Sequence, residues 1–424
     1  RNQMVSGRAR HSGRDDLHFS RFNVINFRAQ ANTIALKAAG STLLFAVLSW
    51  FALAIRSWLR LRRYNAVLMR IWSQHKVSAI WKATESRPLV NTCEHDSMDN
   101  VDVGVNAAVE KLKPLPHSAK AWAIAGDSLA FAAAGRAIML QLAHPFVGQA
   151  MKDHSYILKD PARAVSLRFF RIFGIMFPIW FGPADEKRRH LTKFHRMHRH
   201  VQGVLTGDTA IGPFPSGTRY SARDLRAMWW VNATLIESAI AAFALIDPGR
   251  IHDAALDEYW VSYARPTFSV LGIPDRYVPE TWTSFLEEYM ALWREELGVG
   301  GAACEVLDAL KRSGDTRGAF SAFATRSQLE LARAWLPSPV QNLLPRHSQF
   351  MQCIGSLALH LEIGLYSLGR LILPAKLHEL SPYVEAKVRC GEARSFWHTL
   401  SAVWALRIVY SIIGFPKGLQ PDWS

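Results

Sequence analysis

The sequence has few cysteines, and none of the four belongs to a CxxC pair. Cys93, Cys304, Cys353 and Cys390 lie far apart. Zinc ribbons and small disulfide frameworks need closely spaced cysteines, so the spacing argues against both and is typical of a reducing compartment. Runs in which apolar and polar residues alternate are also scarce, whereas Ala, Leu, Arg and Glu recur at helical spacing. We therefore predict an all-α chain.

Acidic residues are in short supply: 35 Asp and Glu stand against 50 Lys and Arg, a formal net charge of +15 over 424 residues. Such an excess suits either nucleic acid or an anionic membrane surface. No basic run is interleaved with aromatic residues as in a nucleic-acid motif, so we expect no nucleic-acid partner. An arginine cluster beside a long apolar stretch favours a membrane instead.

The clearest uncharged stretch runs from Ala38 to Ile55. Its length of about 18 residues is the lower end of what a transmembrane helix needs. The arginines that follow it are Arg56, Arg60, Arg62 and Arg63. The positive-inside rule then places everything after residue 56 in the cytosol, on a single-pass anchor. A buried or surface-lying apolar helix is the alternative interpretation.

Composition divides the chain into five parts. They are a poorly ordered basic segment (1–37), a transmembrane helix (38–56), a linker with accessory helices (57–120), a large helical domain (121–345) and C-terminal helices (346–424). Residues 350–361 and 400–413 in the last part are apolar. We expect them either to be buried in the core or to dip into one leaflet of the membrane near the anchor.

A histidine-rich stretch lies on a segment with helical spacing, for which Asp185 is the expected N-cap and Gly203 the expected end. At about 100° per residue, one stripe holds Leu191, Phe194, His195, His198, Val201, Gln202 and Leu205. The opposite side holds Arg189, Lys193, Arg196, Arg199 and His200. His198 is therefore predicted to point inward, and His200 toward water. A neutral imidazole in an apolar pocket suits a metal, including haem iron, and a hydrogen-bonded core histidine is the alternative.

Two further positions in the sequence are candidate binding residues. His144 precedes a proline, so we expect it where a helix bends, either as a metal ligand or as a hydrogen-bonded structural histidine. Asp160-Pro161 predicts the start of another helix. On it, Arg163 shares a face with Ser166 and other uncharged residues. This indicates a buried anion near Arg163, such as a carboxylate, a haem propionate or a bound oxygen species, or else an ordinary salt bridge.

Further along, the spacing predicts a helix from about Asp224 to Leu245 and a second from Asp253 to Val270, kinked at Pro266. A third is predicted from after Pro279 to Gly298. The loops between them are short, as expected of packed helices.

Several short motifs follow one another in a recognisable order between Trp122 and Pro279. They are Leu140-Gln141-Leu142-Ala143-His144-Pro145, His154-Ser155, Asp160-Pro161 with Arg163, Phe181-Gly182, His198 with Val201 and Gly203, Gly217 to Ala222, Trp230-Val231, Ala233-Thr234-Leu235 and Leu271-Gly272-Ile273-Pro274. In this order they resemble the catalytic domain shared by rubber oxygenases (latex clearing protein) and the endoplasmic-reticulum-bound oxygenase MpaB.

The resemblance implies a globin-like helical core that binds haem b, with His198 as the proximal iron ligand and Arg163 on the distal side. Arg163 and Ser166 become candidate catalytic residues, and His144 joins the candidate haem contacts. The implied reaction uses O₂ to cleave a C=C bond of an isoprenoid or other lipophilic substrate. The implied location is the endoplasmic reticulum or another organelle membrane, and the sequence identifies no redox partner.

The chain departs from the family pattern at two positions. Leu167 stands where relatives usually carry Thr, and Asn232 where they usually carry His. Two alternatives therefore stay open beside a haem oxygenase. One is a zinc or di-iron site among His190, His195, His198 and His200. The other is a membrane-anchored haem- or metal-binding protein without oxygenase activity.

Overall fold

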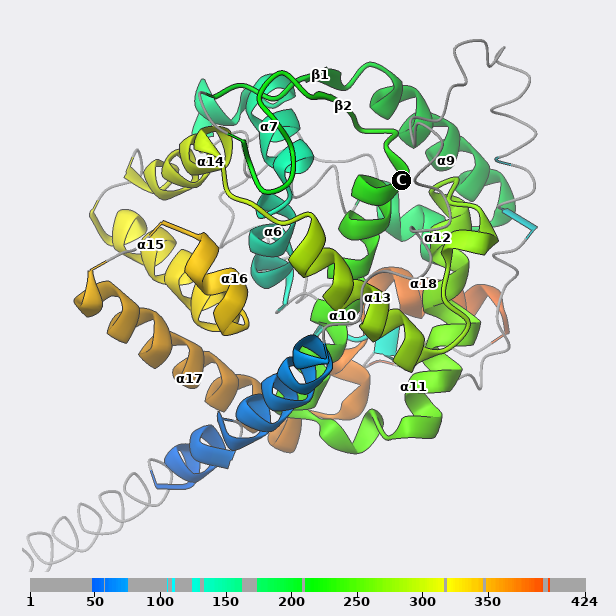
Figure 1. The fold of residues 1–424 in the computed structure, drawn as a ribbon. Helices are drawn as coiled ribbons and strands as arrows, with labels where there is room; N and C mark the ends of the chain where they lie inside the picture. The colour runs from blue at the N-terminus through cyan, green and yellow to red at the C-terminus, as the bar shows by residue number, and fades with distance from the viewer. Residues whose placement is uncertain are drawn as a thin grey trace, which may run out of the picture. The chain divides into compact units, whose positions relative to one another are not determined.

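The computed structural model describes residues 48–56, 58–74, 105, 109–110, 124–129, 133–161, 174–207, 210–315, 319–345, 348–391 and 396. These residues are mostly helical (Figure 1), which confirms the all-α prediction at this coarse level. The chain divides into two units, residues 1–53 and 54–424. In the first unit, residues 48–53 are helical. The second unit holds every labelled element.

The labelled helices are α6 (Ala134–Leu142), α7 (Pro145–His154), α9 (Ala184–Arg199), α10 (Leu225–Ile246), α11 (Asp253–Tyr259), α12 (Arg265–Val270), α13 (Trp282–Glu295), α14 (Gly301–Arg312), α15 (Ala319–Ala334), α16 (Ser338–Leu343), α17 (Gln349–Ile372) and α18 (Ser381–Arg389). Residues 58–73 form an unlabelled helix, drawn blue in Figure 1. Two short strands, β1 (Gln202–Val204) and β2 (Arg219–Ser221), pair antiparallel with Gly203 opposite Tyr220.

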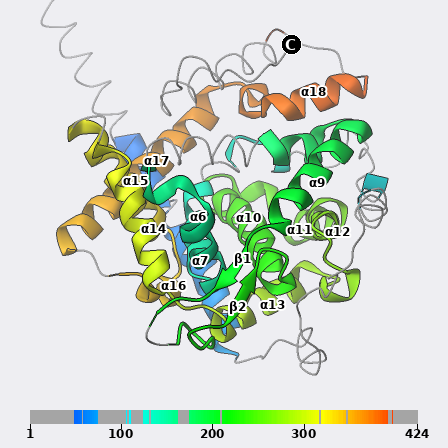
Figure 2. The same ribbon diagram turned by 90° about the horizontal axis from the view of Figure 1, so that it is seen from above.

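Helix α10 is the centre of the core. It begins where the sequence predicts, because the Asp224 carboxylate accepts a hydrogen bond from the Ala227 amide and caps the helix. Trp229 and Trp230 are fully buried on it. Helices α6, α12 and α13 pack against α10, and α15 packs along α17 on one side of the same unit (Figure 2).

The same helix has the length and composition of a membrane span. Among the residues that the structure describes, α10 alone passes this test, and 89% of its most apolar window is buried. It is therefore a core helix. In the predicted membrane segment over 38–56, residues 38–47 lie outside the described residues, and residues 48–56 are helical.

The helix predicted over 253–270 is present and stays helical past Pro266, but its winding changes there. Helix α11 runs into a π-helical segment, Trp260–Ala264, and Pro266 then occupies the first turn of α12. Proline has no amide hydrogen to donate to the preceding turn, so the helix widens just before it. The third predicted helix is α13, which begins after Thr281 with a capping box formed with Ser284.

The predicted end of the histidine-rich helix is wrong. Helix α9 ends at Arg199, and Gly203 lies in β1 instead. A Cβ on Gly203 would lie 2.8 Å from the Tyr220 hydroxyl, so the strand pairing needs a glycine here. Gln202 is consequently on a strand, exposed, and not on the helical stripe of His198. The N-cap is also displaced, from Asp185 to Pro183.

Candidate functional site

His198 lies in the last turn of α9 and is half-buried. Its Nδ1 lies 2.9 Å from the carbonyl oxygen of Phe194, one turn earlier, and its ring stacks on the Phe194 ring with centroids 4.1 Å apart. A carbonyl oxygen only accepts, so Nδ1 carries the proton in this hydrogen bond. The neutral imidazole therefore has its lone pair on Nε2, the nitrogen with which a histidine held in this way binds a metal.

His195 shares the inward stripe with His198 but is held by a different element. Its Nε2 donates to the carbonyl oxygen of Val270 at the end of α12, over 3.2 Å. Burial lowers the pKa of His195, partly offset by that hydrogen bond. The Nε2 proton is thus used to join α9 to α12, which is a structural role.

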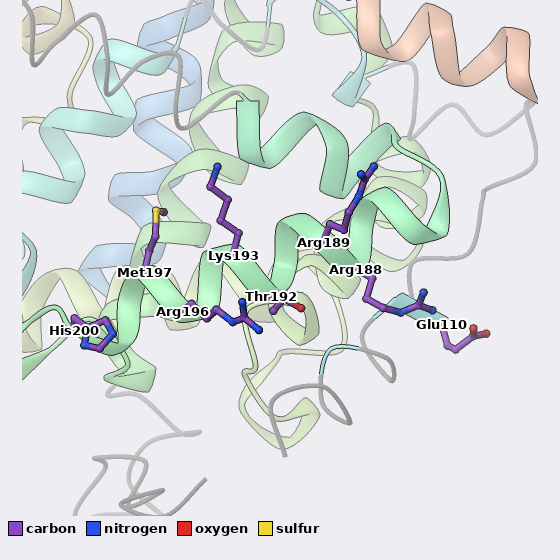
Figure 3. Close-up of a pocket in the computed structure, with 8 residues that line it drawn as sticks. All are labelled: Glu110, Arg188, Arg189, Thr192, Lys193, Arg196, Met197 and His200. Atoms are coloured by element: carbon purple, nitrogen blue, oxygen red, sulfur yellow. The ribbon is translucent and has the colours of Figure 1, made fainter. Parts of the chain in front are cut away.

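The outer face of α9 is basic, as the sequence predicts. Figure 3 shows its side chains around an open surface hollow of about 1170 Å³. The residues around the hollow are Glu110, Arg188, Arg189, Thr192, Lys193, Arg196, Met197 and His200. Arg189 makes only a loose contact with Asp185, 4.0 Å apart and largely exposed. His200 is exposed on this side, away from the inward stripe of His198.

His144 lies at the corner between α6 and α7, where the sequence places a bend. Its Nδ1 accepts the Phe146 amide hydrogen over 3.2 Å and so caps α7. The proton is therefore on Nε2, which lies 3.2 Å from Glu296 Oε2. Both ring nitrogens of this buried histidine are engaged within the protein.

Glu296 is the centre of a small cluster of polar and charged side chains next to His144. Arg226 donates to its other carboxylate oxygen over 2.6 Å. Burial works to raise the pKa of Glu296, but the hydrogen bond from His144, together with the charge and hydrogen bond of Arg226, holds this pKa below its ordinary value. Asp224 lies close by, and there burial prevails and raises the pKa to about 6. Two neighbouring carboxylates thus have pKa values shifted in opposite directions.

Sequence reasoning missed a second, fully buried charged network. Arg136 on α6 pairs with the Glu237 carboxylate on α10, and also donates to Ser238 Oγ over 2.8 Å. The hydroxyl groups of Tyr64 and Tyr289 donate to the same carboxylate over 2.9 and 3.2 Å. The only signal in the sequence was an arginine in the first turn of an otherwise uncharged helix, α6. Because the charge is fully paired, the network holds α6, α10 and α13 together.

The other predicted residues divide into two groups. Arg163, Ser166 and Leu167 lie outside the described residues. Asn232 is buried on α10, and its Nδ2 donates to Thr267 Oγ1 over 2.8 Å, so this departure from the family pattern joins α10 to α12. Trp230, which belongs to one of the family motifs, stacks on Tyr289 and donates to the Leu140 carbonyl within the packed core.

The described residues contain no group of three or more His, Cys, Asp or Glu side chains able to hold a metal ion. A zinc or di-iron site built from such side chains alone finds no support in that part of the chain.

Comparisons with known proteins agree with the order of the motifs. A family model described as the catalytic domain of the ER-bound oxygenase mpaB/B' and rubber oxygenase matches residues 122–384, more than half of the chain. Curated proteins and solved structures give no further match. The matched range contains α6 to α17 and the candidate residues His144, Arg163, Ser166 and His198. The chain belongs to the mpaB/rubber oxygenase catalytic-domain family, and it carries an oxygenase-type catalytic domain.

Proposed function

We propose that this protein is a membrane-anchored b-type haem oxygenase that cleaves a C=C bond of an isoprenoid or other lipophilic substrate with O₂. The observation that carries the proposal is the hydrogen bond from His198 Nδ1 to the Phe194 carbonyl. It favours the neutral tautomer that is protonated on Nδ1 and has its lone pair on Nε2, the tautomer that an axial histidine ligand uses. We propose a globin-like arrangement of the surrounding helices.

The residues fit haem in three ways. His198 supplies a neutral nitrogen ligand, and its ring is held against Phe194, which restricts its rotation. The carbonyl that accepts from Nδ1 increases the basicity of Nε2. Haem bound here would supply an iron centre able to activate O₂. We propose that Arg163 and Ser166 bind and orient the oxygen reactant, as the family resemblance implies.

The proposed reaction balances with O₂ alone. One C=C bond and one O=O bond are broken, and two C=O bonds form, so both oxygen atoms enter the carbonyl products. No external electrons are needed for this stoichiometry, so the proposal does not depend on a redox partner. An apolar, water-excluding site would favour a lipophilic chain over polar compounds.

We further propose that residues 38–56 anchor the protein in the endoplasmic reticulum membrane with the catalytic domain in the cytosol. The family description supports this location, since it names an ER-bound oxygenase. The exposed arginines 56, 62 and 63 support the orientation. A membrane anchor would bring the enzyme to substrates that partition into lipid.

The decisive experiment is an absorbance spectrum of the detergent-extracted full chain. We expect a Soret band in the wild type that disappears in His198→Ala. His200→Ala is the matched control, because His200 is on the same helix end but exposed, and we expect it to keep the band.

Three other results would contradict the proposal in different ways. A Soret band that survives in His198→Ala would show that His198 is not the iron ligand. Stoichiometric zinc without a Soret band would favour a metal-only protein. Bound haem with no cleavage of prenyl chains under O₂ would leave a haem-binding protein without oxygenase activity.

A further inference from the structure

Helix α17 has two apolar faces, and only one of them is covered by protein. The inward face packs along α15 and touches α10, with Leu359 and Ile363 buried there. The outward face exposes Phe350 (72%), Leu357 (59%), Leu361 (40%), Leu365 (64%) and Ile372 (67%). At about 100° per residue these five side chains fall on one stripe along the whole helix.

The outward stripe carries no charge. The charged residues of α17 are Glu362 and Arg370. Arg370 donates to Asp127, over 2.9 and 3.0 Å, and to Asp247, over 2.9 Å. Glu362 hydrogen-bonds to Gln328 on α15, and burial raises its pKa. Both charged side chains therefore lie on the protein side of the helix, away from the outward stripe.

A helix that is apolar on both faces needs an apolar environment on its outward side as well as the protein core on its inward side. Helices at a water-facing surface carry polar residues on the outer side, and contiguous exposed apolar stripes mark an interaction site. The 24 residues of α17 span about 36 Å, so the stripe is long. Because the inward face is fixed to α15 and α10, α17 is suited to lie along a surface rather than to cross a bilayer.

The position of α17 indicates which partner covers it. Arg60 donates to the carbonyls of Leu245 and Ile246 at the end of α10, each over 3.4 Å. Arg370, near the end of α17, binds Asp247, the C-cap of that same helix. The helix over 58–73 and the end of α17 therefore meet at one corner, as Figure 1 also shows.

Further features at this corner suit a membrane surface. In the sequence, the helix over 58–73 follows shortly after the predicted membrane segment 38–56. Leu59 is exposed near its start, and Arg62 and Arg63 are exposed beside it. Lys376 is exposed just after α17. Exposed cations beside an apolar stripe complement anionic lipid headgroups.

We propose that the outward face of α17 lies in the lipid interface, as a second membrane contact beside the N-terminal anchor. Phe350, Leu357, Leu361, Leu365 and Ile372 would enter the outer part of one leaflet. The proposal rests on the membrane attachment proposed above, but not on haem or on oxygenase activity. This second contact would hold the catalytic domain against the bilayer in one orientation. A lipophilic substrate could then enter the catalytic domain from the membrane without passing through water.

The test places a fluorophore on the full chain reconstituted in vesicles. In a background with the native cysteines replaced by serine, bimane is attached to Leu361→Cys or to Met197→Cys. The two positions are matched, since Leu361 is 40% and Met197 41% exposed, and α9, the helix that carries Met197, lies opposite α17 in Figure 1. The vesicles contain phosphatidylcholine and phosphatidylserine, with or without bromine on the acyl chains.

We expect brominated lipid to remove most of the fluorescence at position 361 and to leave position 197 unchanged. Leu357→Cys, at a more exposed position of the same stripe, gives a second readout if Leu361→Cys folds poorly. Unquenched fluorescence at both stripe positions in a chain that sediments with vesicles would overturn the proposal and leave the anchor intact.

Two other outcomes are also decisive. Cross-linking of Leu361→Cys between two copies, without lipid quenching, would make this face a dimer interface and overturn the proposal. A chain that fails to sediment with vesicles would overturn both this proposal and the anchor. The Soret band measured on the same samples reports on the haem independently of these results.

Discussion

At the scale of single residues, the histidines of this chain are distinguished by their hydrogen-bond partners. His144 uses one nitrogen to cap α7 and the other to bind Glu296. His195 donates from Nε2 to Val270, whereas His198 donates from Nδ1 to Phe194. Among these three, only His198 donates from Nδ1, and His360 on α17 shares this pattern by donating from Nδ1 to the Ser356 carbonyl. A neutral His198 then has its lone pair on Nε2, and this difference makes His198 the best axial-ligand candidate of the three.

Asp224 is predicted to make stability depend on pH. Burial raises its pKa from 3.8 to about 6, and the charge of Glu296 acts in the same direction. Between these values the folded chain binds more protons at this site than the unfolded chain does. The contribution of Asp224 to the free energy of unfolding therefore falls as pH rises through this window and stays constant above it.

The variant Asp224→Asn removes this ionisation and keeps an oxygen to cap α10. We expect it to raise the free energy of unfolding at pH 7 by about 1–3 kcal/mol and to have no effect near pH 3. Urea unfolding of both proteins across this pH range measures the difference. A difference that is independent of pH would show that Asp224 is already ionised in the folded chain near pH 4.

At the scale of elements, glycines show where two helices or strands approach most closely. Gly203 lets β1 pass the ring of Tyr220, and Gly355 does the same for α17 against α15. A Cβ at position 355 would lie 2.5 Å from Glu330 Cβ and 2.6 Å from its carbonyl carbon. Backbone atoms are among these neighbours, so a side-chain rotation alone cannot relieve the contact.

Gly355→Ala is therefore expected to lower the free energy of unfolding by about 2 kcal/mol, because α15 and α17 must move apart. Gly369→Ala is the matched control on the same helix, since nothing lies within 4 Å of its added methyl group. We expect the control to stabilise the protein by about 0.5–1 kcal/mol through the better helix propensity of alanine. Thermal unfolding in detergent compares the two. Equal effects of both changes would mean that α15 and α17 are not in close contact.

At the scale of the whole molecule, the second unit is held together by charges buried on separate elements. Arg370 ties the end of α17 to Asp127 and to the end of α10. Arg294 donates to the carbonyl of Trp72 over 2.6 Å and so fastens the helix over 58–73 to α13. These contacts connect the segment after the predicted anchor firmly to the catalytic core.

The proposed anchor predicts resistance to alkaline extraction. Membranes washed with sodium carbonate at high pH should retain the wild-type chain, because peripheral contacts are released and membrane spans are not. The double substitution Leu44→Arg/Leu48→Arg should release it, since each arginine at the centre of a span costs about 2.5–3.5 kcal/mol on insertion scales. Val204→Arg, at an exposed apolar position of β1, is the control and should stay in the membrane fraction. Release of the wild type would contradict a membrane-spanning segment.

The sequence alone determined the features that depend on neighbouring residues. The start of α10 after Asp224 follows from capping, and the change of winding near Pro266 follows from a missing amide hydrogen. The inward and outward faces of α9 follow from helical spacing. These signals act over a few residues, so they can be identified without the fold. The order of the motifs likewise identified the family, which the match over 122–384 confirms.

Only the tertiary structure decided which distant residues meet. His144 and Glu296 are 152 positions apart, and Arg136 and Glu237 are 101 apart. The helix predicted to continue to Gly203 ends earlier, and residues 202–204 form a strand. The reason is that the partner strand around Tyr220 supplies hydrogen bonds that local spacing does not reveal. Likewise, the sequence showed that α17 is apolar, but packing decided which of its faces is left uncovered. Pairings of this kind depend on the path of the whole chain, and helical periodicity carries no information about that path.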